Sequence, residues 1–212
     1  MRNKFDEQLK NLNDEMIKMG TMIEANIQKA IEALVKSDVE LAKNIMEKDS
    51  LIDQKQRDIE AICFNLLIQQ QPVAKDLRAI TAAMKMVTDM ERIGDHAADI
   101  SEITIVLADK DKTKGYDTII KMASEASVML IESIDAFTKK DKIMAKDVIE
   151  HDDVVDELFC KAKLELIEII KNEPKRGEQE LDMLMIAKYL ERIGDHATNI
   201  AEWVIYAIDD RK

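Results

Sequence analysis

A seven-residue segment, ERIGDHA, occurs twice in the chain, at residues 91–97 and 191–197. In each copy a glutamate precedes an aspartate by four residues, so both carboxylates lie on one face of a helix. The two pairs are Glu91 with Asp95 and Glu191 with Asp195. Helical rotation of about 100° per residue places this face on an apolar stripe. A carboxylate in that setting needs hydrogen bonds, a cation or a proton.

A second pair of acids with the same spacing precedes each copy. These pairs are Asp49 with Asp53 and Asp152 with Asp156. Each half of the chain therefore offers four carboxylates on two helices, a set of oxygen ligands that suits iron, manganese, magnesium or calcium. Acids four residues apart are also common on solvated helix faces, and Arg92 and Arg192 are available as ordinary ion-pair partners. The residue types alone leave a metal-binding and a structural role open.

The other polar residues of the repeat fit supporting roles. Gly94 and Gly194 weaken a helix by about 1 kcal/mol each, so close helix approach or room beside the acids explains them. His96 and His196 point about 100° away from the preceding acid, which favours hydrogen bonding over ligation. His151 is expected at the surface, with a weak ligand role open because acids follow it.

The whole chain is an internal duplication. Residues 31–53 match residues 134–156, and the ERIGDHA segments match in turn. We expect two units, residues 1–110 and 115–212, joined by the charged segment DKDKTKG at 109–115.

Each unit is expected to contain three helices. The six ranges are Lys4–Lys36, Asp38–Gln70, Pro72–Ala108, Tyr116–Thr138, Asp141–Asn172 and Glu178–Ile208. Asp38 and Asp141 are candidate N-caps, Pro72 suits a first helical turn, and Pro174 ends a helix. Ile45, Ile52, Ile59 and Leu66 form an apolar stripe, and no segment alternates as a strand does. The prediction is an all-α protein of two tandem three-helix bundles, packed end to end or side by side.

Composition narrows the classes of function. The net charge of −12 argues against nucleic acid as a partner, because phosphate contacts need a basic face. No apolar run is long enough to insert into a membrane, and the N-terminal residues contain no secretory signal, so we expect a cytoplasmic protein. Cys63 and Cys160 are expected as buried free thiols, with a disulfide or metal role as the alternative.

The chain resembles the PhoU family of bacterial phosphate-uptake regulators. The matching segments are DMERIGDHAADI at 89–100 and YLERIGDHATNIAEWV at 189–204, preceded by MEKDSLIDQ at 46–54 and IEHDDVVDE at 149–157. The resemblance covers essentially the full chain. It implies metal ligation by Asp49, Asp53, Glu91, Asp95, Asp152, Asp156, Glu191 and Asp195. The metal would be iron or another divalent or transition metal, in clusters, with no organic cofactor. Asp99 of the first half is Asn199 in the second, so the two sites are expected to differ.

The resemblance also implies a function. Members of this family are cytoplasmic negative regulators of phosphate uptake and of the phosphate-starvation response, and so act in phosphate homeostasis. They link the ATPase subunits of the phosphate-specific ABC transporter to a sensor histidine kinase, often as homodimers. An adaptor that is not an enzyme is therefore expected. The alternatives are a metal-cluster protein with redox or hydrolytic activity, for which no additional acid, base or nucleophile is evident, and acids that only stabilise the bundles through a cation.

Overall fold

The computed structural model describes residues 2–69, 72–110 and 116–209. Its six long helices are α1 (Arg2–Lys36), α2 (Val39–Gln69), α3 (Ala74–Leu107), α4 (Asp117–Lys139), α5 (Lys142–Asn172) and α6 (Gly177–Ile208), with a short 3-10 helix, η1 (Pro174–Arg176), between α5 and α6. No strand occurs within the described ranges. The all-α prediction is confirmed, and most of the expected linker, residues 111–115, lies outside the described residues.

The helix boundaries follow local chemistry. The Asp141 carboxylate accepts hydrogen bonds from the backbone N–H groups of Ile143 and Met144, and Asp38 accepts one from Leu41 at 3.0 Å. Both are N-caps, as predicted. The prediction for Pro72 is wrong, because α3 begins at Ala74. Pro174 does follow the end of a helix, where it opens η1.

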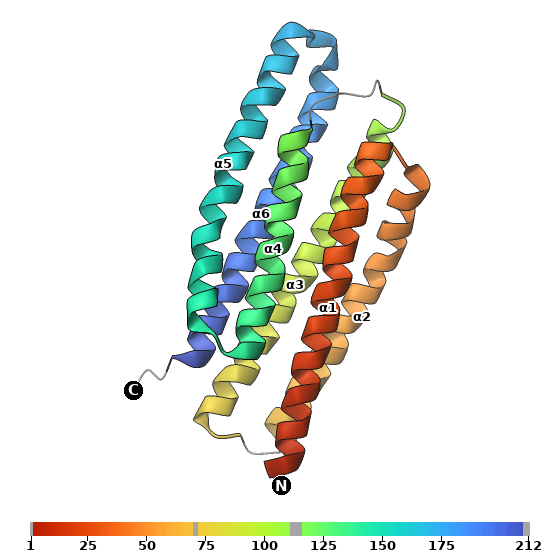
Figure 1. Cartoon of the computed structure of the whole chain (residues 1–212). Helices are drawn as coiled ribbons and strands as arrows, with labels where there is room; N and C mark the ends of the chain where they lie inside the picture. The colour runs from red at the N-terminus through yellow and green to blue at the C-terminus, as the bar shows by residue number, and fades with distance from the viewer. Residues whose placement is uncertain (1, 70–71, 111–115, 210–212) are drawn as a thin grey trace.

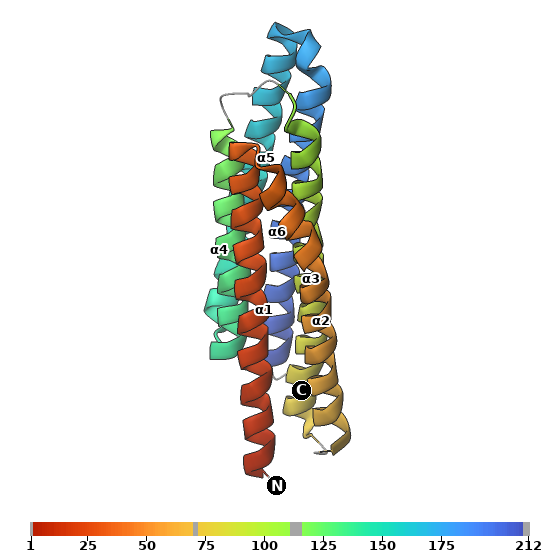
Figure 2. The same ribbon diagram turned by 90° about the vertical axis from the view of Figure 1, so that its right-hand side faces the viewer.

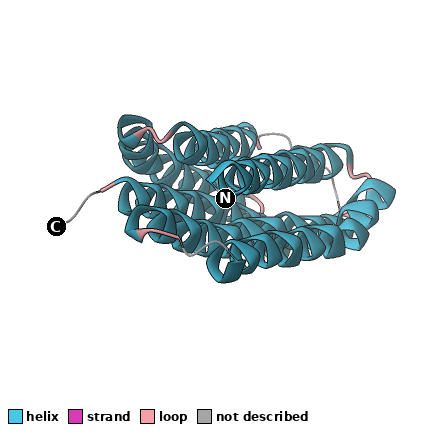
Figure 3. Cartoon of the chain, turned by 90° about the horizontal axis from the view of Figure 1, so that it is seen from below, coloured by secondary structure: helices cyan, strands magenta, loops and turns pink. Residues whose placement is uncertain are grey.

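The six helices form two layers. In one layer α2, α3, α6 and α5 lie side by side in that order, so α3 and α6 join the two halves. Helices α1 and α4 contact each other and cover one face of this row (Figures 1 and 2). Figure 3 shows the helices from below. The contacts of α3 with α6 and of α1 with α4 place the bundle of α1–α3 beside the bundle of α4–α6. Of the two packings expected, the side-by-side arrangement is the observed one.

The core is aliphatic and rich in methionine. Ile45, Ile52, Ile59 and Leu66 of α2 are all at most 1% exposed, which confirms the predicted stripe. Removing such area from water is the main force that holds the helices together. Cys63 is buried as expected, whereas the prediction for Cys160 is wrong. Cys160 lies two residues from buried Leu158, about 200° around α5, and therefore faces solvent.

None of the helices, over the residues described, combines the length and apolar character that a membrane-spanning segment needs.

Substitution Asp141→Ala is expected to destabilise the protein by about 1 kcal/mol, because α5 loses the acceptor for two N-terminal N–H groups. For a domain of this size the melting temperature should fall by about 2–4 °C. Asp147→Ala, at an exposed position of the same helix, is the matched control and should change it less. Thermal unfolding followed by circular dichroism measures both; equal effects would remove the capping role.

Candidate metal centre

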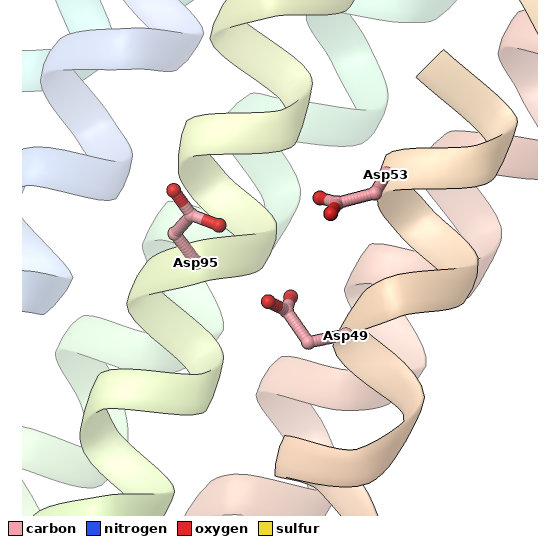
Figure 4. Close-up of side chains that lie close together, drawn as sticks. All are labelled: Asp49, Asp53 and Asp95. Carbon is pink, nitrogen blue, oxygen red and sulfur yellow. The ribbon is translucent and has the colours of Figure 1, made fainter. Parts of the chain in front are cut away.

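The first set of acids meets across the contact between α2 and α3. One carboxylate oxygen from each of Asp49, Asp53 and Asp95 lies within 4.8 Å of the other two. Figure 4 shows the two aspartates of α2 and the one of α3 pointing into the same space. All three side chains are partly buried, which is where the helical phase of the repeat places them. Glu91 lies one turn before Asp95 on α3 and is also partly buried.

Close helix packing brings these acids together. A Cβ atom added to Gly94 would lie 3.0 Å from two side-chain carbons of Ile52, which lies next to Asp53 in α2. The glycine therefore lets α3 approach α2 at the turn that carries Asp95. Of the two explanations for this glycine, close approach is the one observed.

Burial and mutual repulsion make these carboxylates hard to ionise. Burial, followed by the charges of Asp95 and Asp53, raises the pKa of Asp49 to about 6. The pKa of Asp95 is raised by burial and then by Asp53, and that of Glu91 by burial and then by Asp95. Arginines provide little relief: Arg57 Nη1 is 4.0 Å from Asp53, and Arg92 Nε is 3.6 Å from Glu91, with both arginines mostly exposed.

This arrangement suits a metal cation. The three carboxylates present only oxygen ligands, come from two helices and repel one another in the absence of a counter-charge. Hard and intermediate divalent cations bind such oxygen sets. Asp49, Asp53 and Asp95 would hold the cation, with Glu91 next to them. The cation would supply positive charge that favours the ionised acids and connects α2 to α3.

The second set of acids is arranged differently. Asp152 is partly buried, and its pKa is raised to about 6 by burial and then by Asp156 and Asp195. Asp156 and Asp195 are themselves exposed. Within the described ranges no three oxygens of this set come as close together as those of the first. A Cβ atom added to Gly194 would lie 3.0 Å from Asp152 Oδ1, so here the glycine provides room beside an acid.

Both histidines of the repeat form hydrogen bonds at the boundary between the halves. His96 Nδ1 lies 3.2 Å from Asp99 Oδ2, and its ring stacks on Tyr189 with centroids 5.3 Å apart. His196 Nδ1 lies 2.9 Å from Asp89 Oδ1, across the boundary. The expected hydrogen-bonding role is therefore seen in both copies.

A hollow of about 360 Å³ connects this histidine pair with the first acid set. It is lined by side chains of α2, α3 and α6: Asp49, Arg92, Asp95, His96, Ala98, Asp99, Arg192 and His196. No residue of α1 or α4 lines it, so the first acid set is approached from the face that those helices leave uncovered. His151 lies elsewhere and is partly buried, with Nε2 2.9 Å from Glu125 Oε2 of α4.

Sequence reasoning missed three residues of these sites. Asp89 accepts hydrogen bonds from His196 and from Asn199 of the other half. Tyr189 occupies the position of Asp89 in the second copy, and its ring stacks on His96. Lys188 forms an ion pair with Glu191. All three lie just before ERIGDHA, at positions where the two copies differ. A difference between the two copies beside an otherwise identical segment is the sequence feature that could have identified these residues.

Comparison with known proteins gives a consistent result. The family model described as the PhoU domain matches residues 16–104 and again residues 119–204. The phosphate-specific transport system accessory protein PhoU homolog of Clostridium acetobutylicum is 37% identical over 209 residues, which covers 98% of this chain and 95% of the relative.

Solved structures agree in fold. PhoU from Pseudomonas aeruginosa matches with a TM-score of 0.90 and 35% identity, over 96% of this chain and 98% of that one. The phosphate transport system regulatory protein PhoU from Streptococcus pneumoniae matches with a TM-score of 0.87 and 29% identity, over 96% of each chain.

The pKa of Asp49 predicts a dependence of stability on pH. Folding raises this pKa from 3.8 to about 6. The Asp49 carboxyl therefore costs no stability below about pH 4, and it lowers the stability of the fold progressively as the pH rises from about 4 through 6. In metal-free protein, Asp49→Asn should therefore gain stability relative to wild type between pH 4 and 7.5. The measurement is denaturant unfolding in chelator at several pH values.

The control for this experiment is Asp147→Asn, at an exposed position, whose difference from wild type should stay nearly constant with pH. If the stability difference between Asp49→Asn and wild type were equally independent of pH, the metal-free fold would not raise the pKa of this carboxyl group.

Proposed function

Because this chain belongs to the PhoU family, we propose that it is an accessory, regulatory protein of a phosphate-specific transport system. The observation that supports this most strongly is the extent of the match. It includes both halves of the chain and nearly the full length of relatives that carry that description. The function is thereby assigned to the duplicated fold as a whole.

The finer role that we propose is negative regulation of phosphate uptake and of the phosphate-starvation response. The protein acts in the cytoplasm as an adaptor, in which it contacts the ATPase subunits of the phosphate transporter and a sensor histidine kinase, and it forms a homodimer. Long helices with extensive solvent-exposed faces suit an adaptor, since they offer broad surfaces for protein contacts.

The acids contribute a metal centre in this proposal. Asp49, Asp53 and Asp95, with Glu91 beside them, hold iron or another transition or divalent cation where α2 meets α3. The cation makes the relative position of these helices depend on metal occupancy, because its charge offsets the burial and the repulsion that raise the pKa of Asp49. Its role is to set the shape and stability of the adaptor.

We favour an adaptor over a redox or hydrolytic enzyme. Catalysis at a metal needs a placed acid, base or nucleophile in addition to the ligands. The two histidines nearest the first acid set already have Nδ1 against Asp99 and Asp89. Their positions suit the joining of the two halves, through α3 and α6, better than proton transfer at a substrate.

Deletion of the gene should release phosphate-starvation genes from repression in phosphate-rich medium. Alkaline phosphatase activity of the cells, together with uptake of labelled phosphate, measures this. Wild-type protein and an Asp147→Asn control should restore repression, because Asp147 is exposed and belongs to neither acid set. A deletion strain with normal phosphatase control and normal uptake would contradict the regulatory proposal.

A further inference from the structure

The two acid sets differ in their nearby charges, and one of these differences places a lysine beside the second set. Counting back three residues from the glutamate of each ERIGDHA segment gives Thr88 in the first half and Lys188 in the second. The Thr88 hydroxyl donates a hydrogen bond to the Met84 carbonyl at 3.3 Å and brings no charge. The Lys188 ammonium instead pairs with Glu191, a carboxylate that is only 14% exposed. The cations beside the first set are the mostly exposed Arg57 and Arg92, at 4.0 and 3.6 Å from their acids, whereas Lys188 forms a direct hydrogen bond to its acid.

A second residue fixes this lysine from the neighbouring helix. Lys188 Nζ lies 5.4 Å from the ring centroid of Phe159 on α5, within the range of a cation–π contact. In the first half, the residue three positions after Asp53 is Gln56, whereas Phe159 stands three positions after Asp156. Both members of the contact are thus found in the second half alone. Both contacts are made by the ammonium group, so together they offset the rotamer entropy that is lost when this side chain is ordered.

The geometry of the acids agrees with this difference. In the first set, three oxygens lie within 4.8 Å of one another. In the second, Asp156 and Asp195 are exposed to solvent and Glu191 is engaged by the lysine. The second half also contains Asn199 where the first has Asp99, which removes one further negative charge. A cation that enters the second set would meet an ammonium and fewer available carboxylates.

We propose that Lys188, held by Phe159, is a built-in counter-cation of the second acid set, so that this chain binds metal in the first half and far more weakly in the second. The inference rests on the proposed metal-binding role of the first set. An ordinary surface ion pair would add little stability and would not affect metal binding. The counter-cation instead limits the second set to a structural role and gives the duplicated protein one metal-responsive half.

The test measures Mn²⁺ binding to the full chain by calorimetry, with metal content after dialysis as a second readout. The substitutions Asp49→Asn and Asp95→Asn together disable the first set, so that the second can be observed alone. In that background Lys188→Thr installs the residue of the first half, and Lys188→Arg keeps the charge as a matched control. We expect Lys188→Thr to bind Mn²⁺ at least about tenfold more tightly than either the lysine or the arginine protein.

The reciprocal change tests the same idea without disabling any acid. Thr88→Lys with Gln56→Phe transfers the lysine and its aromatic support to the first half, and Mn²⁺ affinity there should fall at least about tenfold. Circular dichroism confirms that each variant is folded.

Three results would overturn the inference. One is that Lys188→Thr binds Mn²⁺ no more tightly than its parent. Another is that the transplant leaves the first half unchanged. The third is that the second half binds metal fully with Lys188 present, in which case the metal-binding proposal would stand. If neither wild type nor Lys188→Thr bound Mn²⁺, both proposals would fail.

Discussion

The electrostatic cost of placing several carboxylates at a contact between helices governs this structure. Asp49 and Asp53 on α2 face Asp95 on α3, and Gly94 lets the two helices approach closely at this point. Partial burial and mutual repulsion both oppose ionisation, and the nearby arginines are mostly exposed. The fold can accommodate this only with protons or with a cation. The first acid set suits a metal cation, whereas in the second set the Lys188 ammonium group pairs with Glu191.

Duplication explains both the similarity and the difference of the halves. Each half repeats three helices and the segment ERIGDHA, and the two copies meet through α3 and α6. At that boundary His196 bonds to Asp89, while His96 stacks on Tyr189, the counterpart of Asp89. One pair of equivalent positions therefore performs two tasks. Because the first acid set and this boundary line the same hollow, a change of charge at the acids acts close to the contact that holds the halves together.

Local chemistry made much of the structure predictable. Helix boundaries, the caps at Asp38 and Asp141 and the stripe from Ile45 to Leu66 depend on residues within a few positions of one another. The facing of the acid pairs in the first half followed from helical phase, whereas Asp156 and Asp195 of the second half are exposed. The sequence left open whether the bundles pack end to end or side by side, since that depends on long-range contacts. For the same reason the partners of His96 and His196 could not be foreseen. Cys160 was misjudged because the surrounding helix is apolar on its other face.

Metal content per chain, measured by mass spectrometry on protein purified without chelator or metal-affinity resin, decides whether the first acid set holds a metal. The comparison is between wild type and a variant with Asp49→Asn, Asp53→Asn and Asp95→Asn. We expect iron or another transition metal in the wild type and its near-complete loss in the variant. A folded wild type without metal, whose melting temperature is unchanged by added Fe²⁺ or Mn²⁺, would contradict this expectation. The acids would then be stabilised by protons and hydrogen bonds alone.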